Sequence, residues 1–188
     1  GAGGDLLDGG ADADTIDGGD GNDSILGGFG FDSLAGGIGS DTIEGGAGSD
    51  AILGGLGGDL LNGGEDADVI DGEAGADTIF GGTGDDVLAG GLAADQVAGG
   101  TGNDQIDGGA GNDALNGGDG GDTDGGGTGN DTLNGGDGLD VLNAGEGNDN
   151  AFGGAGNHQI AGGDGDDAGN GVAGDDTVEG DSGSDRLI

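Results

Sequence analysis

The sequence contains almost no basic residues. Arg186 is its only Lys or Arg, against 40 acidic residues, and the formal net charge is −39 at pH 7. Binding to nucleic acid requires Lys and Arg side chains that replace condensed counterions, so this composition excludes nucleic acid as a partner. Because such a chain repels itself, cations are the expected partners.

Cysteine is absent, which excludes a disulfide framework and thiolate metal sites. No apolar run approaches the roughly 20 residues of a membrane span, and no basic, apolar export signal precedes the first repeat. The sequence opens inside a repeat at Gly1 and stops just after a core position at Leu187. We therefore expect it to be part of a longer protein with flanking domains.

Apolar surface is scarce as well. Only 30% of the residues are hydrophobic, whereas 60 are glycines, whose backbone loses the most entropy on folding. A chain with so little apolar surface and so much like charge is expected to stay unfolded until a counter-ion binds.

A repeat of nine residues fills the sequence. Every ninth residue from Asp5 to Asp185 is aspartate, except His158, and no insertion or deletion disturbs this register. The unit is G-G-x-G-x-D-x-U-x, where U is aliphatic, as in the segment 18–26. A strict repeat predicts one quasi-one-dimensional array over residues 1–188 rather than several globular domains.

Each unit is expected to form one strand and one turn. Glycines at fixed offsets indicate backbone with positive φ, and they predict a six-residue turn. The remaining three residues alternate polar, apolar, polar, as in Thr15, Ile16 and Asp17, which indicates a strand. Stacking these strands about 4.8 Å apart builds two facing parallel sheets. The predicted fold is all-β, a right-handed parallel β-roll (β-solenoid) with two nonapeptides per coil and about 10 coils.

The eighth position of alternate units predicts two interior rows of aliphatic side chains. The first row consists of Leu7, Ile25, Ile43, Leu61, Ile79, Val97, Leu115 and Leu133. The second consists of Ile16, Leu34, Ile52, Ile70, Leu88, Ile106, Leu142, Ile160 and Val178. One apolar residue in nine makes a thin core, so the turns are expected to supply much of the stability.

The segment from about 120 to 188 is less regular. Asp124, Ala151 and Gly169 occupy core positions there, and Val172 and Asp181 replace turn glycines. Looser packing is expected in this segment, with the largest cost at Asp124 if its carboxylate is buried without a partner.

The turns carry the chemistry. Ca²⁺ takes six to eight oxygen ligands in flexible geometry, and these turns offer both backbone carbonyls and carboxylates. Since successive turns alternate sides, aspartates 18 residues apart stack along one edge, about 5 Å apart, and would repel one another without a cation between them. The predicted metal ligands are Asp5, Asp14, Asp23, Asp32, Asp41, Asp50, Asp59, Asp68, Asp77, Asp86, Asp95, Asp104, Asp113, Asp122, Asp131, Asp140, Asp149, Asp167, Asp176 and Asp185.

The stoichiometry follows from the stacking. The 21 turns leave 19 gaps between same-side neighbours, so the chain offers places for up to about 19 Ca²⁺, whose charge nearly balances the −39 of the protein. His158 weakens the two gaps that it borders. This near-balance predicts that calcium is a structural component of the fold.

In this repeat the sequence resembles the RTX (repeats-in-toxin) calcium-binding β-roll of bacterial secreted toxins, proteases, lipases, adhesins and surface-layer proteins. The resemblance covers essentially the whole sequence. It implies Ca²⁺ held between consecutive same-side turns by the repeat aspartates and turn carbonyls. It further implies type I secretion and a chain that is disordered in low cytosolic calcium and folds in an extracellular setting.

Two sharper hypotheses concern single residues and chemistry. His158, the only histidine, could sense pH or ligate a transition metal near Asp140 and Asp176, but zinc needs more nitrogen or sulfur ligands than this chain has, so loss of a calcium site is favoured. Enzymatic activity is not expected. There is no His-Glu-x-x-His motif, and the six serines lack a usable base.

Two functional classes stay open. One is a calcium-dependent structural module within a secreted or cell-surface protein. The other is a self-assembling fibre or surface-layer subunit joined end to end through uncapped solenoid ends, since unpaired strand edges are adhesive. Apolar residues expected on the outside are candidates for lateral contacts, namely Phe31, Phe80, Phe152, Leu26, Leu53 and Leu60.

Overall fold

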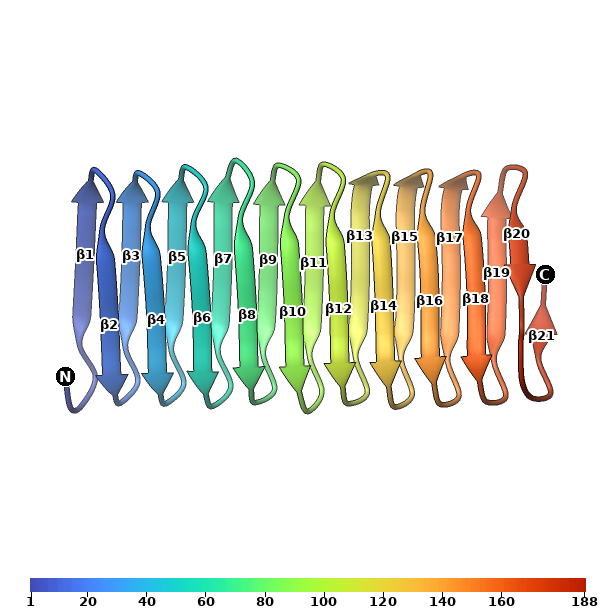
Figure 1. Ribbon diagram of the computed structural model, residues 1–188, viewed down its shortest axis with the longest axis horizontal. Helices are drawn as coiled ribbons and strands as arrows, with labels where there is room; N and C mark the ends of the chain where they lie inside the picture. Colours follow the sequence, from blue (N-terminus) through green and yellow to red (C-terminus); the bar gives the residue numbers. More distant parts are fainter.

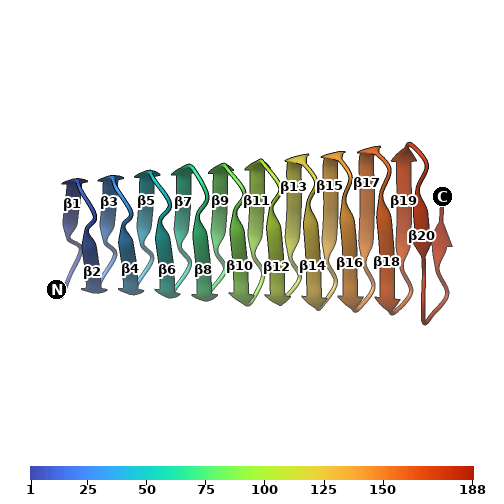
Figure 2. The ribbon, with the colours of Figure 1, turned by 45° about the horizontal axis from the view of Figure 1, so that its top comes forward.

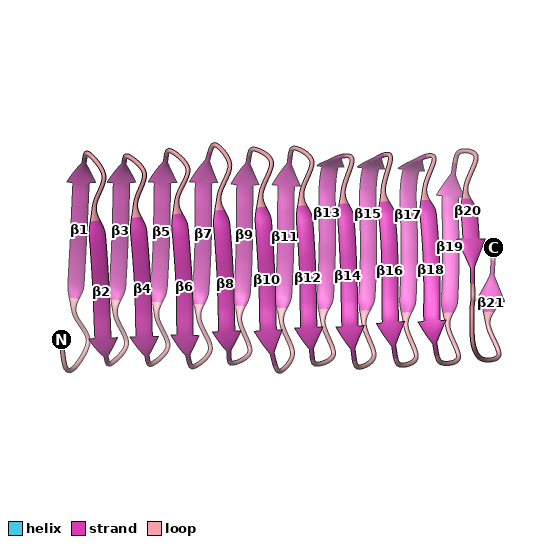
Figure 3. Ribbon diagram, in the orientation of Figure 1, coloured by secondary structure: helices cyan, strands magenta, loops and turns pink.

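The computed structural model describes all 188 residues as a two-layered coil of short parallel strands (Figure 1). The odd-numbered strands form an 11-stranded sheet and the even-numbered strands a 10-stranded sheet, each in the order of the sequence. The view in Figure 2 shows the chain passing from one sheet to the other at every turn. Strands and turns make up the whole ribbon in Figure 3, and no helix is long and apolar enough to cross a membrane.

The strands follow the nonapeptide register. The odd strands are β1 Leu6–Ala11, β3 Ser24–Phe29, β5 Thr42–Ala47, β7 Leu60–Glu65, β9 Thr78–Thr83, β11 Gln96–Thr101, β13 Ala114–Gly120, β15 Thr132–Gly138, β17 Asn150–Gly156, β19 Ala168–Ala173 and β21 Arg186–Leu187. The even strands are β2 Thr15–Asp20, β4 Ser33–Ile38, β6 Ala51–Leu56, β8 Val69–Ala74, β10 Val87–Leu92, β12 Gln105–Ala110, β14 Thr123–Thr128, β16 Val141–Glu146, β18 Gln159–Asp164 and β20 Thr177–Glu179.

Each strand pairs with the strand two further along the chain, so one coil contains 18 residues. In the pair β3 and β5, for example, Ile25 lies beside Ile43 and Gly28 beside Gly46. The prediction of an all-β parallel solenoid with two nonapeptides per coil and about 10 coils is confirmed.

The predicted strand length was wrong. Most strands have six residues rather than three, and the turns between them have only three, such as Gly21, Asn22 and Asp23. The two adjacent glycines belong to the strand because side chains alternate between the two faces of a sheet. The first glycine, two residues after the core aliphatic, therefore points inward, where no side chain fits, and the second continues the ladder with positive φ, as in Gly28 at 107°.

The predicted rows make up most of the core. Sixteen hydrophobic residues are buried in one cluster, 14 from the predicted rows together with Ala144 and Ala151, and Leu7, Ile16 and Val178 pack against it while partly exposed. Leu61 and Leu133 have no exposed surface. Burying each aliphatic side chain contributes roughly 1.5 to 3 kcal/mol, so this single row per sheet is an appreciable but modest source of stability.

The irregular core positions behave differently from one another. Asp124 in β14 is buried between Ile106 and Leu142 of the neighbouring strands, and neither carboxylate oxygen has a hydrogen-bond partner. At Gly169 the neighbours have closed in, because an added Cβ would lie 2.7 Å from Cγ1 of Val178. Asp124 is therefore the costly defect, whereas the missing side chain at Gly169 is largely compensated.

Six residues other than glycine adopt positive φ. They are Asp12, Asp66, Glu73, Ala93, Val172 and Asp181. The β-branched Val172, at φ 73°, is the least suited to this conformation. All six stand where the repeat normally has glycine, so the predicted need for positive φ at these offsets is confirmed.

Candidate metal centre

The repeat aspartates turn into the ends of the coils. From Asp23 to Asp149 each of these side chains is buried, and those at the two ends of the roll, such as Asp5 and Asp185, are half-buried. The first glycine of the unit makes the space. A Cβ added at Gly54 would lie 2.7 Å from Oδ2 of Asp59 and 2.8 Å from the carbonyl oxygen of Gly72 in the next coil. This glycine is therefore required by the carboxylate that follows it.

In every repeat aspartate except Asp5 and Asp14, one carboxylate oxygen joins successive coils. Oδ1 of Asp41 accepts the backbone N–H of Asp23 at 2.7 Å, and Oδ1 of Asp50 accepts that of Asp32 at 2.8 Å. The same bond, always 18 residues apart, recurs along both edges. We call these two series the aspartate ladders, and each defines the stacking of the turns on its edge.

The second oxygen is buried without a partner. Oδ2 has no hydrogen bond in 17 ladder aspartates, namely Asp14, Asp23, Asp32, Asp41, Asp50, Asp59, Asp68, Asp77, Asp86, Asp95, Asp104, Asp113, Asp122, Asp131, Asp140, Asp149 and Asp167. A buried charged oxygen without a partner is strongly destabilising. The ladders therefore need protons or cations to be stable.

The donor set around these oxygens fits a hard cation. The space that a side chain at Gly54 would fill is bordered by a carboxylate oxygen and a backbone carbonyl oxygen, and the same pair borders Gly45 and Gly63. No point of the structure brings together three carboxylate or imidazole groups. Each gap thus offers at most two carboxylates, from the turns above and below it, supplemented by carbonyls, and this all-oxygen set suits Ca²⁺ better than transition metals.

The electrostatics of the ladders agree with this need. Burial raises the pKa of Asp68 to about 7, although the N–H of Asp50 lowers it, and repulsion from Asp86 and Asp50 raises it further. Burial likewise raises the pKa values of Asp77 and Asp104 to about 6. Without a cation, the folded roll favours protonated carboxyl groups.

A further series of hydrogen bonds between coils was not predicted from the sequence. At the residue before the repeat aspartate, Asn or Asp side chains accept a backbone N–H from the next coil, the reverse of the aspartate ladders. The longest run joins Asn112 to Asn130, Asn148, Asp166 and Ser184, with N···O distances of 2.7 to 2.9 Å. Recurrent Asn and Asp at this position was the available signal. We call this run the Asx ladder.

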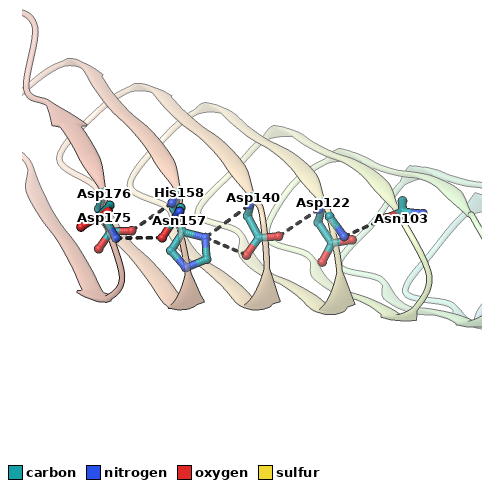
Figure 4. Close-up of polar contacts among 8 residues, drawn as sticks. Asn103, Asp122, Asp140, Asn157, His158, Asp175 and Asp176 are labelled. Carbon is teal, nitrogen blue, oxygen red and sulfur yellow. Dashed lines mark hydrogen bonds and ion pairs between the residues drawn. The ribbon is translucent and has the colours of Figure 1, made fainter.

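His158 takes the place of a carboxylate in its ladder (Figure 4). Its Nδ1 lies 3.3 Å from the backbone nitrogen of Asp140, which donates to it, and 3.1 Å from Oδ2 of Asp140. The backbone N–H of His158 donates to Oδ1 of Asp176 at 2.9 Å. The imidazole thus preserves the coil-to-coil hydrogen bond but supplies no anionic oxygen.

The predicted neighbours of His158 are confirmed, but the transition-metal hypothesis gains no support. Nε2 of His158 is buried without a partner. The chain has no other histidine and no cysteine that could join it as a ligand. His158 is therefore best described as an interruption in an oxygen ladder.

Comparison with known families accounts for the whole length of the chain. The model of the RTX calcium-binding nonapeptide repeat matches residues 1–34, 27–61, 53–88, 62–97, 89–124, 125–160 and 161–188. A search among curated proteins gave no match. With its repeat, its parallel solenoid and its stacked aspartates, the chain belongs to the RTX calcium-binding nonapeptide repeat family.

Proposed function

We propose that this chain is a structural scaffold of a secreted or cell-surface protein, which folds when Ca²⁺ binds between stacked turns outside the cell. The observation that carries the proposal is the series of buried Oδ2 atoms without partners along both edges. A divalent cation in each gap would offset the repulsion between the carboxylates above and below it. The proposed ligands are the 20 repeat aspartates and the turn carbonyls.

Calcium and folding are coupled in this proposal. The apolar core has one row per sheet, and the chain carries a charge of −39, so the calcium-free chain lacks the means to offset its backbone entropy. Binding free energy then becomes folding free energy. Low cytosolic calcium would keep the chain unfolded for export by a type I route, and higher external calcium would fold it.

The number of ions has an upper bound of about 19, one for each gap between same-side turns. His158 borders two of these gaps and supplies no carboxylate to either, so we propose fewer ions there. The role is structural, and the proposal assigns no catalytic residue.

Far-UV circular dichroism during a calcium titration tests the proposal, with magnesium as the control ion. A cooperative change from coil to β structure with calcium alone is expected. Mg²⁺ is smaller and dehydrates reluctantly, so it should not replace calcium in gaps built for flexible coordination. A spectrum indifferent to calcium would remove the basis of the proposal.

End-to-end assembly is the second candidate function. In the 11-stranded sheet, β1 and β21 each have a neighbour on one side only, and such open edges accept further strands. Light scattering after size exclusion separates the two candidates. A calcium-loaded monomer supports the isolated module, whereas mass that grows with protein concentration supports the fibre.

A further inference from the structure

The outer surface of the 10-stranded sheet is apolar over β4, β6, β8 and β10, which are neighbours in that sheet (Figure 1). Six large side chains on these strands are between 43% and 59% exposed. Leu53, Val69 and Val87 occupy outward positions next to core residues, and Ile38, Leu56 and Leu92 are the last residues of their strands, beside the turns. We call this region the apolar face.

Large apolar residues of the face are direct neighbours on adjacent coils at two places. Ile38 lies beside Leu56 in the strand register, and Val69 lies beside Val87. Further along the same sheet, the outward positions of β12, β14, β16 and β18 start with Gln105, Thr123, Val141 and Gln159, of which only Val141 is apolar. The nonapeptide repeat does not explain this contrast, because the outward positions are free to be polar on every coil.

The size of the apolar face suits a short segment of polypeptide. Four strands about 4.8 Å apart, each of six residues rising about 3.3 Å, present about 400 Å². A standard interface buries about 800 Å² on each partner. The face is therefore too small to hold a second copy of this chain in a stable dimer by itself, whereas an amphipathic helix of a few turns, or a single strand, would cover it.

The charges at the apolar face also disfavour a second copy. Asp71 lies between Leu53 and Ala89 in the register, near the middle of the face, and Glu73 is exposed two residues later. Oδ1 of Asp71 accepts the N–H of Glu73 at 2.9 Å, so one carboxylate oxygen is already engaged in a local turn. Asp71 is not a repeat aspartate, so it lies outside the aspartate ladders.

A second copy would offer Arg186 as its only basic side chain. It would set Asp71 and Glu73 against further acidic residues, an unfavourable arrangement. A partner with Lys or Arg beside its apolar residues would instead pair with them. We infer that the apolar face binds a cationic amphipathic polypeptide segment, with its apolar side on Leu53, Leu56 and Val69 and a basic side chain at Asp71.

The inference goes beyond the proposed calcium scaffold and requires only that the roll be folded. The probe is a synthetic amphipathic helix of Leu and Lys, titrated into the calcium-folded protein by calorimetry at about 0.15 M salt, where exposed charges more than about 8 Å apart are screened. Circular dichroism before each titration shows whether the roll is folded. Failure of calcium folding is therefore detected separately from failure of binding.

A cationic peptide will bind weakly anywhere on so acidic a protein, so the decisive quantity is a difference between variants. Leu53→Ser with Leu56→Ser should weaken binding by about 10-fold or more, since two apolar contacts are lost. Asp71→Asn should weaken it several-fold. The matched control, Leu26→Ser with Leu60→Ser, removes two exposed leucines of the other sheet and should bind as the unmodified protein does.

Two results would overturn the inference. One is equal affinity of the Leu53→Ser, Leu56→Ser variant and the unmodified protein, which would reduce the binding to general electrostatics. The other is a dimer without peptide that this variant abolishes, which would make the face a self-association surface. If the double variant does not fold, Leu92→Ser at the margin of the face provides the same comparison.

Discussion

The first two thirds of the roll and its last third join successive coils by different means. From Ile25 to Leu115 every unit buries an Ile, Leu or Val. After that, Asp124, Ala151 and Gly169 interrupt the rows. Hydrogen bonds of the Asx type have the opposite emphasis: the Asx ladder runs from Asn112 to Ser184, whereas the preceding part has only the bond from Ser40 to Asn22 and a short run that joins Asp85, Asn103 and Gly121.

This difference shows that the aspartate ladders are the common element of the fold. They run through both regions with the same hydrogen bond, whereas core aliphatics and turn asparagines vary. Stability in the first region rests on the aspartate ladders and an uninterrupted core, and in the second on the aspartate ladders, an interrupted core and the Asx ladder. This division is tested by moving a buried carboxyl group or an Asx acceptor from the last third into the regular region, and by removing them from the last third.

The largest effect is expected from a defect moved into the regular region. Ile79→Asp places a carboxyl group where the native side chain has no exposed surface, as Asp124 does in the last third. A buried carboxyl group without a partner should cost about 3 kcal/mol or more in the free energy of unfolding. Urea unfolding in saturating calcium measures this loss. Ile79→Val, the control, should cost only about 1 kcal/mol.

Protons should partly replace calcium. Burial raises the pKa values of Asp68 and Asp95 to about 7 and 6 in the folded roll, from 3.8. An acid with a raised folded-state pKa favours folding below its unfolded pKa, and this contribution is lost as the pH rises through the folded value. Calcium-free protein should thus gain β structure as the pH is lowered from 7.5 to 4.5. Circular dichroism that stays unchanged over this range would contradict the assigned burial of the ladders.

Replacing the buried Asp124 by an aliphatic residue should raise the free energy of unfolding. Asp124→Leu restores an aliphatic residue between Ile106 and Leu142 and should stabilise the roll by about 2 kcal/mol. Burial, with repulsion from Asp122, Asp140 and Asp104, raises the pKa of Asp124 to about 8. The advantage of the variant should therefore grow from about pH 4 to about pH 8. An advantage independent of pH would argue for a packing effect alone.

Restoring the ladder at His158 should change the ion count. His158→Asp supplies a carboxylate to the two gaps beside it, toward Asp140 and Asp176, and should add one or two Ca²⁺ per chain. Native mass spectrometry counts the ions. His158→Asn, which keeps an acceptor without a charge, should leave the count unchanged, and a gain in this control would show that charge is not the limiting factor.

The smallest effects concern the Asx ladder. Asn130→Ala removes the acceptor of the Asn148 N–H and should cost about 1 kcal/mol. Ala76→Asn, in the regular region, offers an acceptor to the N–H of Ala94, an exposed residue, and should gain a few tenths of a kcal/mol. Equal and negligible effects of both changes would show that the Asx ladder does not distinguish the two regions.

The fold could be predicted from the sequence because its register is written in every unit. The repeat position is aspartate in 20 of 21 units and the core position is Ile, Leu or Val in 18 of 21, with no insertion or deletion, so strand order, core and stacked turns follow from the period alone. Strand length could not be predicted, since glycine usually indicates a turn. Here Gly18 and Gly27 lie within strands because a following carboxylate occupies the space of their side chains.

The site was predictable in composition but not in detail. Stacked aspartates follow from the 18-residue coil, yet the division of labour between Oδ1 and Oδ2 depends on the direction in which each side chain leans along the roll. The same holds for Asn130 and Asn148, whose side chains reach forward by one coil rather than back. Periodicity fixes which residues are neighbours, and only the geometry shows which of their atoms meet.

In the proposed function, cations between buried Oδ2 atoms hold the roll together at neutral pH. The most direct measurement is the number of calcium ions bound per folded chain, by native mass spectrometry on samples whose folding is followed by circular dichroism. β structure and bound calcium should rise together to more than ten ions, up to about 19. A chain that folds at neutral pH with no calcium, or with only a few ions, would contradict it.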